Sequence, residues 1–200
     1  MTIKHIITAA SVAANVTGLL SNATGAAGAG WALTANAAGD SLAHLITIKG
    51  DAVTDHSAKT AIITGTLYGV AQTETVALPN GTATVTSTKY FSTVTSVSPS
   101  ATIGADTMDI GWAAGSVSAP ASMRLSRIDF MMGFGCTIDS GTPTYGVQQS
   151  YDGANWFNHA AVTNETTAQA GEIITPVEAV RLVFTAAGGV TFTGLQSDAR

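Results

Sequence analysis

Alternating apolar and polar positions run through most of this chain, and they predict β-strands. A period of two, rich in Val, Ile and Thr, places one face of a strand against a core and the other toward water. No stretch is long and periodic enough to predict a helix. In the first half the expected strands are residues 30–34, 44–49, 61–68, 93–98 and 107–112, together with the two arms of a hairpin within 72–97.

The hairpin predicted within residues 72–97 is the clearest local signal. Its arms are rich in Thr and Val, which fit a pleated sheet. Between them Pro79-Asn80-Gly81 combines a fixed φ with two residues that tolerate positive φ, as a tight turn requires. Ser87 opens the stretch 87–91, where its capping hydroxyl predicts a single helical turn that kinks the second arm.

The alternation changes parity after residue 120. Met123 and Leu125 share one parity, whereas Ile128 and Phe130 share the other. One extra residue in a strand moves every later side chain to the opposite face, so we expect a bulge near Ser126-Arg127.

The remaining pattern sets the expected domain organisation. Residues 145–151 alternate as a strand that ends in a turn at 152–155, and a final hairpin joins 180–185 to 190–195 through Ala187-Gly188-Gly189. Residues 114–120 are small and uncharged and end in proline, which is typical of a linker. We therefore predict an all-β protein with two antiparallel β-sandwich or barrel-like domains in series. Their bounds are 31–115 and 116–200, preceded by an extended N-terminal arm over 1–30 that packs along its own body or a neighbouring subunit.

Composition points to assembly. Among 200 residues only 10% are charged, and the mean hydropathy is +0.29, so the polar surface consists mostly of uncharged side chains. Such a surface does little to keep copies apart by charge repulsion, and we expect a homo-oligomer or membership of a larger assembly.

The charge balance and the apolar runs exclude other partners. A net charge of −5 with eight scattered Lys and Arg residues argues against direct nucleic-acid contact, which requires clustered cations. No run reaches the roughly 18 apolar residues of a membrane span. The apolar stretch 6–14 is interrupted by Thr8 and Ser11, so we expect it to belong to a mature cytoplasmic product and not to a signal peptide.

Several titratable residues lie close together in sequence without a recognised motif. Asp40 precedes His44, and Asp51 and Asp55 precede His56, but the spacings match no metal-ligand pattern. We interpret them, with Asp106 and Asp109, as solvated turn residues that satisfy local backbone groups. Cys136 lies between apolar residues and is expected to be a small buried hydrophobe. We expect no catalytic residues, no metal and no cofactor.

One aromatic cluster near the C-terminus combines side chains that suit a sugar. Aromatic rings stack on sugar rings, and neighbouring amides bind the hydroxyls. The candidate ligand or partner contacts are Tyr151, Trp156, Asn158 and His159, with Tyr145 and Phe157 nearby. In the competing interpretation, 151–156 is a tight turn and Trp156 closes the domain core.

A further signal comes from two sets of short passages. The first is GDSLAH at 39–44, AQTETV at 71–76, PNGT at 79–82 and STKYFSTVTSV at 87–97, and the second is VQQSYD at 147–152, WFNH at 156–159 and PVEAVRL at 176–182. The first set resembles a β domain that recurs in structural proteins of tailed bacteriophages. The second is similar to the C-terminal half of the same kind of virion protein. The resemblance covers most of residues 40–195 and implies a virion role without catalytic residues.

Two hypotheses from different classes follow. In the first, the chain is a capsid decoration (cement) subunit that contacts the major capsid protein or other virion proteins, and it resides in the virion after assembly in the host cytoplasm. In the second, it belongs to the tail, neck or adsorption apparatus and binds a glycan or receptor through its C-terminal domain.

Overall fold

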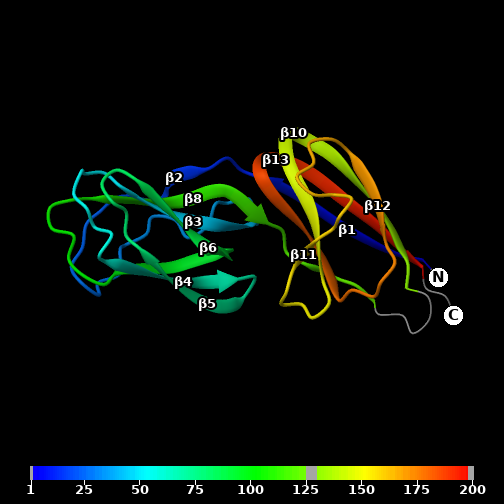
Figure 1. The fold of residues 1–200 in the computed structure, drawn as a ribbon, viewed down its shortest axis with the longest axis horizontal. Helices are drawn as coiled ribbons and strands as arrows, with labels where there is room; N and C mark the ends of the chain where they lie inside the picture. The colour runs from blue at the N-terminus through cyan, green and yellow to red at the C-terminus, as the bar shows by residue number, and fades with distance from the viewer. Residues whose placement is uncertain (1, 125–129, 198–200) are drawn as a thin grey trace. The chain divides into compact units, whose positions relative to one another are not determined.

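The chain is all-β, as its alternation predicts. A computed structural model describes residues 2–124 and 130–197, and this part of the chain contains strands, turns and no helix (Figure 1). Contacts divide the chain into two compact units. Unit 1 comprises Met1–Val12 and Val117–Arg200, and unit 2 comprises Ala13–Ser116.

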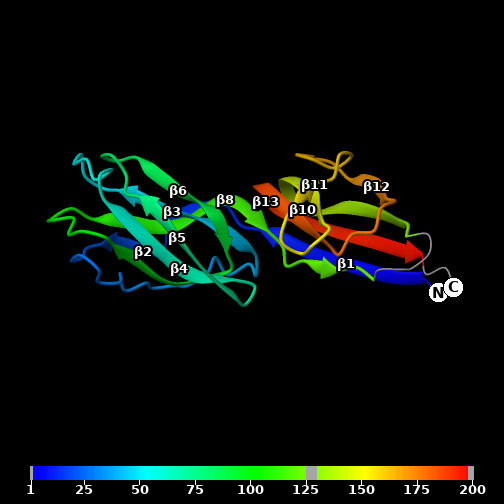
Figure 2. The same ribbon diagram turned by 60° about the horizontal axis from the view of Figure 1, so that its bottom comes forward.

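Unit 2 is sandwich-like and contains two sheets. The larger has the strand order β2 (Asn15–Ala23), β8 (Met108–Val117), β3 (Ala43–Gly50) and β6 (Thr84–Phe91), and the smaller has the order β5 (Val70–Ala77), β4 (Thr60–Leu67) and β7 (Thr93–Pro99). All of these strands except β7 are labelled in Figure 2. Apolar side chains from both sheets are fully buried, among them Ile48, Ile63 and Val97. Their burial supplies the main stabilisation of this unit.

The hairpin predicted within 72–97 is wrong in its pairing. Its first arm, β5, pairs with β4, whereas its second arm, β6, pairs with β3, so the arms belong to different sheets. The true hairpin is β4–β5, closed by the pair Leu67↔Val70. Its two loop residues, Tyr68 (φ 48°) and Gly69 (φ 88°), both have positive φ. This is the backbone of a type I′ turn, whose twist matches that of the strands.

The helical turn predicted at 87–91 is also wrong, although the ladder is distorted there. These residues belong to β6, and the register with β3 shifts between Leu45 and Thr47. The Ser87 hydroxyl accepts a hydrogen bond from Ile46 N at 2.8 Å and donates to Lys89 O at 2.9 Å. A buried side chain thus replaces a missing ladder bond, which is the usual accounting for a bulge.

Residues 31–36 form a strap between the two sheets and not the strand predicted at 30–34. Trp31 N donates to Val97 O, and Val94 N donates to Asn36 O, each at 2.8 Å, so both ends of the strap lie along β7. In the middle, Thr34 N donates to Leu19 O of β2 at 2.8 Å. Since its hydrogen bonds divide between two sheets, the segment cannot continue as a strand of either one.

Unit 1 is organised around two strands of 19 residues each, β10 (Met132–Ser150) and β13 (Ala179–Ser197). They pair antiparallel from Met132↔Gln196 to Ser150↔Ala179, with register shifts between Ile138 and Tyr145. The outer edge of β13 is joined by β1 (Thr2–Ser11) and β9 (Ala121–Ser122), and that of β10 by β12 (Gln169–Ile173) and β11 (Phe157–Asn158). The concave side of this curled sheet buries Phe134, Tyr145, Leu182, Phe184 and Phe192.

The predicted final hairpin is wrong, because residues 187–189 continue β13 instead of turning the chain. Opposite them the β10 register shifts, and Gly188 has φ 145°. A Cβ at Gly188 would lie 2.6 Å from Pro143 Cδ, so the close approach of the two strands requires glycine. The bulge predicted near Ser126-Arg127 lies outside the described residues.

Residues 1–30 contain two strands that complete the body of the protein. β1 pairs with β13 from Thr2↔Ser197 to Ser11↔Gly188 and buries Ile7 and Ala9. β2 belongs to the larger sheet of unit 2. The segment therefore packs along its own chain, one of the two alternatives expected for it. The predicted linker at 114–120 is strand over its first four residues, because β8 continues to Val117.

Glycines let β2 approach β8 closely. A Cβ on Gly111 would lie 1.8 Å from Asn15 O, and one on Gly18 would lie 2.2 Å from Trp112 Cζ3. Trp112 Nε1 then donates to Ala13 O at 3.0 Å.

Gly111→Ala should therefore destabilise unit 2 by about 1 to 3 kcal/mol, because the added methyl group must displace backbone and not a flexible side chain. Urea unfolding followed by tryptophan fluorescence measures the change. The matched control is Gly133→Ala, because a Cβ at Gly133 meets nothing within 4 Å. Equal stability of the two variants would contradict this account of the β2–β8 contact.

Candidate functional site

The four predicted contact residues lie near the β10–β11 edge of unit 1, but they do not converge. In the ladder Gln148 is opposite Asn158 and Gln149 is opposite Phe157. Successive residues of a strand point to opposite faces, so Asn158 and Phe157 lie on different faces of the sheet. The sequence places these side chains together, whereas the structure assigns three of them to two groups and leaves His159 outside both.

The first group is the Arg181 cluster, formed by Arg181, Gln148, Asn158 and Trp156. The guanidinium carbon of Arg181 lies 4.1 Å from the centroid of the Trp156 ring. Arg181 Nε donates to Gln148 Oε1 at 2.8 Å, and Gln148 Nε2 donates to Asn158 Oδ1 at 2.9 Å. The Gln148 amide, itself held by Asn158, thus fixes the guanidinium against the Trp156 ring, which favours a cation–π contact.

Trp156 is half-buried over this cation and does not close the core. The competing expectation, which placed Trp156 in the domain core, is therefore wrong. The sequence offered no signal for Arg181 as its neighbour, because the two residues are 25 positions apart and meet only through the β10–β13 register.

The second group is the aromatic pair Tyr151–Phe157. Their ring centroids are 5.9 Å apart at an interplanar angle of 54°, and the two residues are 52% and 53% exposed. Gln149 Nε2 donates to the Tyr151 hydroxyl at 3.0 Å, and Thr175 Oγ1 lies 3.4 Å from the same oxygen. Two half-exposed rings beside amide and hydroxyl groups have the composition of a sugar-binding surface.

The predicted turn at 152–155 is confirmed and holds this edge in place. Asp152 Oδ1 accepts hydrogen bonds from Ala154 N at 2.9 Å and from Asn155 N at 2.7 Å, and Gly153 has φ 71°. These bonds, with the Asn155 amide, lower the pKa of the Asp152 carboxyl. The carboxylate is therefore a cap for the turn and is not available as a proton donor at neutral pH.

His159 has a structural environment. Its Nε2 donates to Glu172 O at 3.0 Å, and its ring and the Phe134 ring are nearly perpendicular with centroids 5.1 Å apart. It ties the segment after β11 to β12, away from both the Arg181 cluster and the aromatic pair. Of the four predicted residues, His159 is the one that the structure places beside neither group.

The carboxylate–imidazole pairs of unit 2 are more buried than the sequence suggests. Asp40 Oδ2 lies 2.8 Å from His44 Nε2, and their side chains are only 4% and 2% exposed. His56 Nε2 lies 2.9 Å from Asp106 Oδ2, and Lys59 Nζ lies 3.1 Å from His56 Nδ1. The solvated-turn interpretation is therefore wrong for both histidines and for Asp40, whose side chains are buried inside the unit, and for Asp109, which is only 6% exposed within β8.

The other carboxylates serve the backbone or nearby polar side chains. Hydrogen bonds from the Ser57 side chain and from Ser57 N, the latter at 2.8 Å to Oδ1, lower the pKa of Asp55. Asp109 Oδ1 accepts from Asn22 N at 3.1 Å. Asp51 accepts from Lys49 Nζ at 3.3 Å. Within residues 2–124 and 130–197 no three His, Cys, Asp or Glu side chains gather as a metal site would require. Cys136 is buried as predicted, and burial raises its pKa to about 12.

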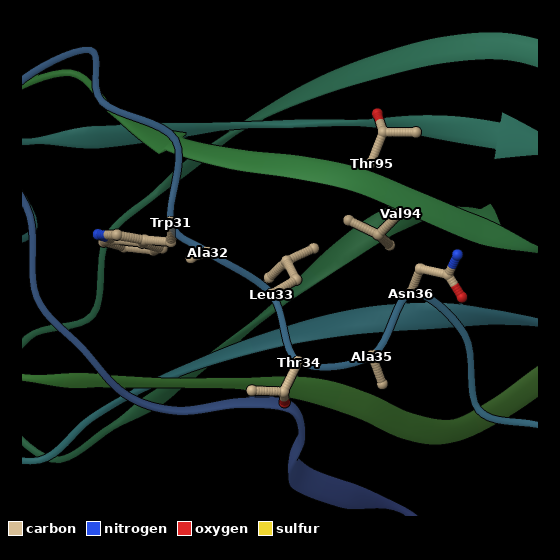
Figure 3. A pocket seen from close by; sticks show the side chains of 8 residues that line it. All are labelled: Trp31, Ala32, Leu33, Thr34, Ala35, Asn36, Val94 and Thr95. Atoms are coloured by element: carbon tan, nitrogen blue, oxygen red, sulfur yellow. The ribbon is translucent and has the colours of Figure 1, made fainter.

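A hollow of about 630 Å³ lies between the strap and β7 in unit 2 (Figure 3). Trp31 lies at one end, and its indole nitrogen points away from the other lining residues (Figure 3). The two hydroxyls that border the hollow are already used: Thr34 Oγ1 donates to Leu19 O and Thr95 Oγ1 donates to Thr64 O. The hollow thus offers few directed polar groups, which a small-molecule site needs.

Comparison with known proteins does not place the chain in a family. No protein-family model matches the chain, and no curated protein matches its sequence. The resemblance to phage virion proteins therefore stays a prediction. None of the described segments is a helix of the length and hydropathy needed to span a membrane.

Trp156→Ala should lower the free energy of unfolding by about 1 to 2 kcal/mol, the range expected for a partly desolvated cation–π contact. Phe184→Ala, a fully buried control in the same unit, should cost about 3 to 5 kcal/mol. Denaturant titration of both variants measures the difference. A loss of stability for Trp156→Ala as large as that for Phe184→Ala would instead support a core position for Trp156.

Proposed function

We propose that this protein is a structural subunit of a tailed-bacteriophage virion, built from two β domains in series. Its role is that of a capsid decoration, or cement, protein that stabilises the head through contacts with the major capsid protein. It is assembled into the virion in the host cytoplasm. The sequence resemblance over residues 40–195 supports this role, as does the all-β structure.

The observation that carries the proposal is the number of large apolar side chains that the strands expose on a weakly charged surface. In unit 1 Ile6 is 54% exposed and Leu195 is 52% exposed. In unit 2 Ile62 and Val70 are 46% and 70% exposed. Exposed apolar groups on several strands, with only 10% charged residues, suit a protein whose surface is covered by protein neighbours.

The copy number of the chain in purified particles tests the proposal. A decoration subunit follows the capsid lattice, so we expect hundreds of copies per particle, measured by quantitative mass spectrometry against the major capsid protein. The heads of particles without the chain should also break down at a lower temperature, and addition of the purified chain should restore their thermal stability. A handful of copies per particle would contradict the decoration role.

A second candidate function is supported by the exposed aromatic pair. In this alternative the chain belongs to the tail, neck or adsorption apparatus and binds a glycan or receptor through unit 1. Tyr151 and Phe157 would stack on sugar rings, while Gln149 and Thr175 bind hydroxyl groups.

Glycan-array binding with the full chain tests this alternative. Phe157→Ala should reduce binding by about fivefold to thirtyfold, because a stacked ring contributes about 1 to 2 kcal/mol. Ile62→Ala removes an equally exposed apolar side chain from unit 2 and is the control. An array without a binding glycan, or equal binding by both variants, would exclude this function for the aromatic pair.

A further inference from the structure

The convex face of the unit 1 sheet has larger side chains along β1 and β13 and glycines along β10. Ladder partners arrange its outward side chains in rows across β1, β13, β10 and β12. One row is Lys4, Leu195, Gly133 and Glu172, and the next is Ile6, Thr193, Gly135 and Ala170. In both rows the β10 position is a glycine, and its β13 neighbour, Leu195 or Thr193, carries the larger side chain.

The glycines of β10 border a hollow that lies beside exposed apolar side chains. A Cβ on Gly133 meets nothing within 4 Å, and one on Gly135 meets only Gln169 O at 3.9 Å. The hollow above these glycines has a volume of about 480 Å³ and is bordered by Thr193 and Leu195. The face therefore presents the exposed Leu195 side chain at the border of this hollow.

Opposite charges lie at the two ends of the first row. Lys4 is at the β1 edge and Glu172 is at the β12 edge, and both are exposed. Neither has an ion-pair partner among the residues that the structure describes. Four strands at a spacing of about 4.8 Å separate these two residues by about 14 Å.

We infer that this face binds the same face of a second copy of the chain around a two-fold axis. The axis runs parallel to the strands, between β13 and β10. Such a rotation places Leu195 over Gly133 of the second copy, Ile6 over Ala170 and Lys4 over Glu172. The face is self-complementary in both shape and charge, as an isologous interface requires.

The geometry tolerates the twist of real sheets. Packed sheets cross at about 30°, and the charged residues lie about 7 Å from the centre of the face, so the crossing moves them by about 4 Å. The long side chains of Lys and Glu span that displacement. The two paired rows make a small contact, below the about 1,200 Å² in total at which stable specific interfaces begin, so the association is weak and reversible in solution.

Charge reversal tests the pairing of Lys4 with Glu172. Sedimentation velocity of the full chain, at concentrations up to about 500 μM, should show a monomer–dimer equilibrium. Lys4→Glu and Glu172→Lys should each raise the dissociation constant by about tenfold, and the double variant should return it to within about threefold of the original. A chain that stays monomeric, or a double variant no tighter than the single ones, would overturn the inference.

Filling the hollow tests the fit of Leu195. Gly133→Leu adds a side chain where the chain itself leaves open space, so the variant should fold and lose dimer formation. Leu195→Ser should do the same, whereas Val70→Ser, at an exposed site in unit 2, should leave the dimer unchanged. Circular dichroism confirms folding of each variant. Dimers that persist in folded Gly133→Leu would place the interface elsewhere. This inference does not depend on the virion role, because it concerns purified chains alone.

Discussion

The full-length pairing of β10 with β13 is the constraint on which unit 1 depends. Both strands are 19 residues long, and every other strand of the unit pairs with one of them. The ladder brings the N-terminal strand β1 beside the end of the chain, which fixes both in one sheet. Gly188 permits the bend midway along the ladder, so the sheet curls and encloses its aromatic core.

In unit 2, in addition to the buried apolar core, side chains complete backbone hydrogen bonds between the strands and loops. Ser87 repairs the β3–β6 ladder, the Tyr68 hydroxyl accepts from Ala43 N at 3.0 Å, and Glu74 accepts from Thr88 N and Lys89 N at 2.8 Å. Several of these groups are partly or fully buried. Buried backbone groups must be satisfied, so these polar residues specify which strands come together as much as the apolar ones do.

The surfaces of unit 1 follow from the β10–β13 ladder and from the strands that pair with its two members. The β10–β11 pairing places Phe157 and Asn158 on opposite faces, and the β10–β13 pairing brings Arg181 to the Trp156 ring. Strand pairing also aligns larger residues of β1 and β13 with glycines of β10 in rows on the convex face. The aromatic pair and the face proposed for self-association lie on different parts of the unit, so each can be altered without the other.

The sequence alone determined the all-β class and the locations of β3, β4, β7 and β8, because alternation of apolar and polar residues is a local property of a strand. It also determined the Asp152 turn, which is closed by bonds within four residues. Pairing was decided by tertiary structure, because a strand satisfies its backbone equally well with any neighbour and only the packed core selects one. For this reason Pro79-Asn80-Gly81 suggested a hairpin that does not form, and Arg181 joined Trp156 without any signal in the sequence.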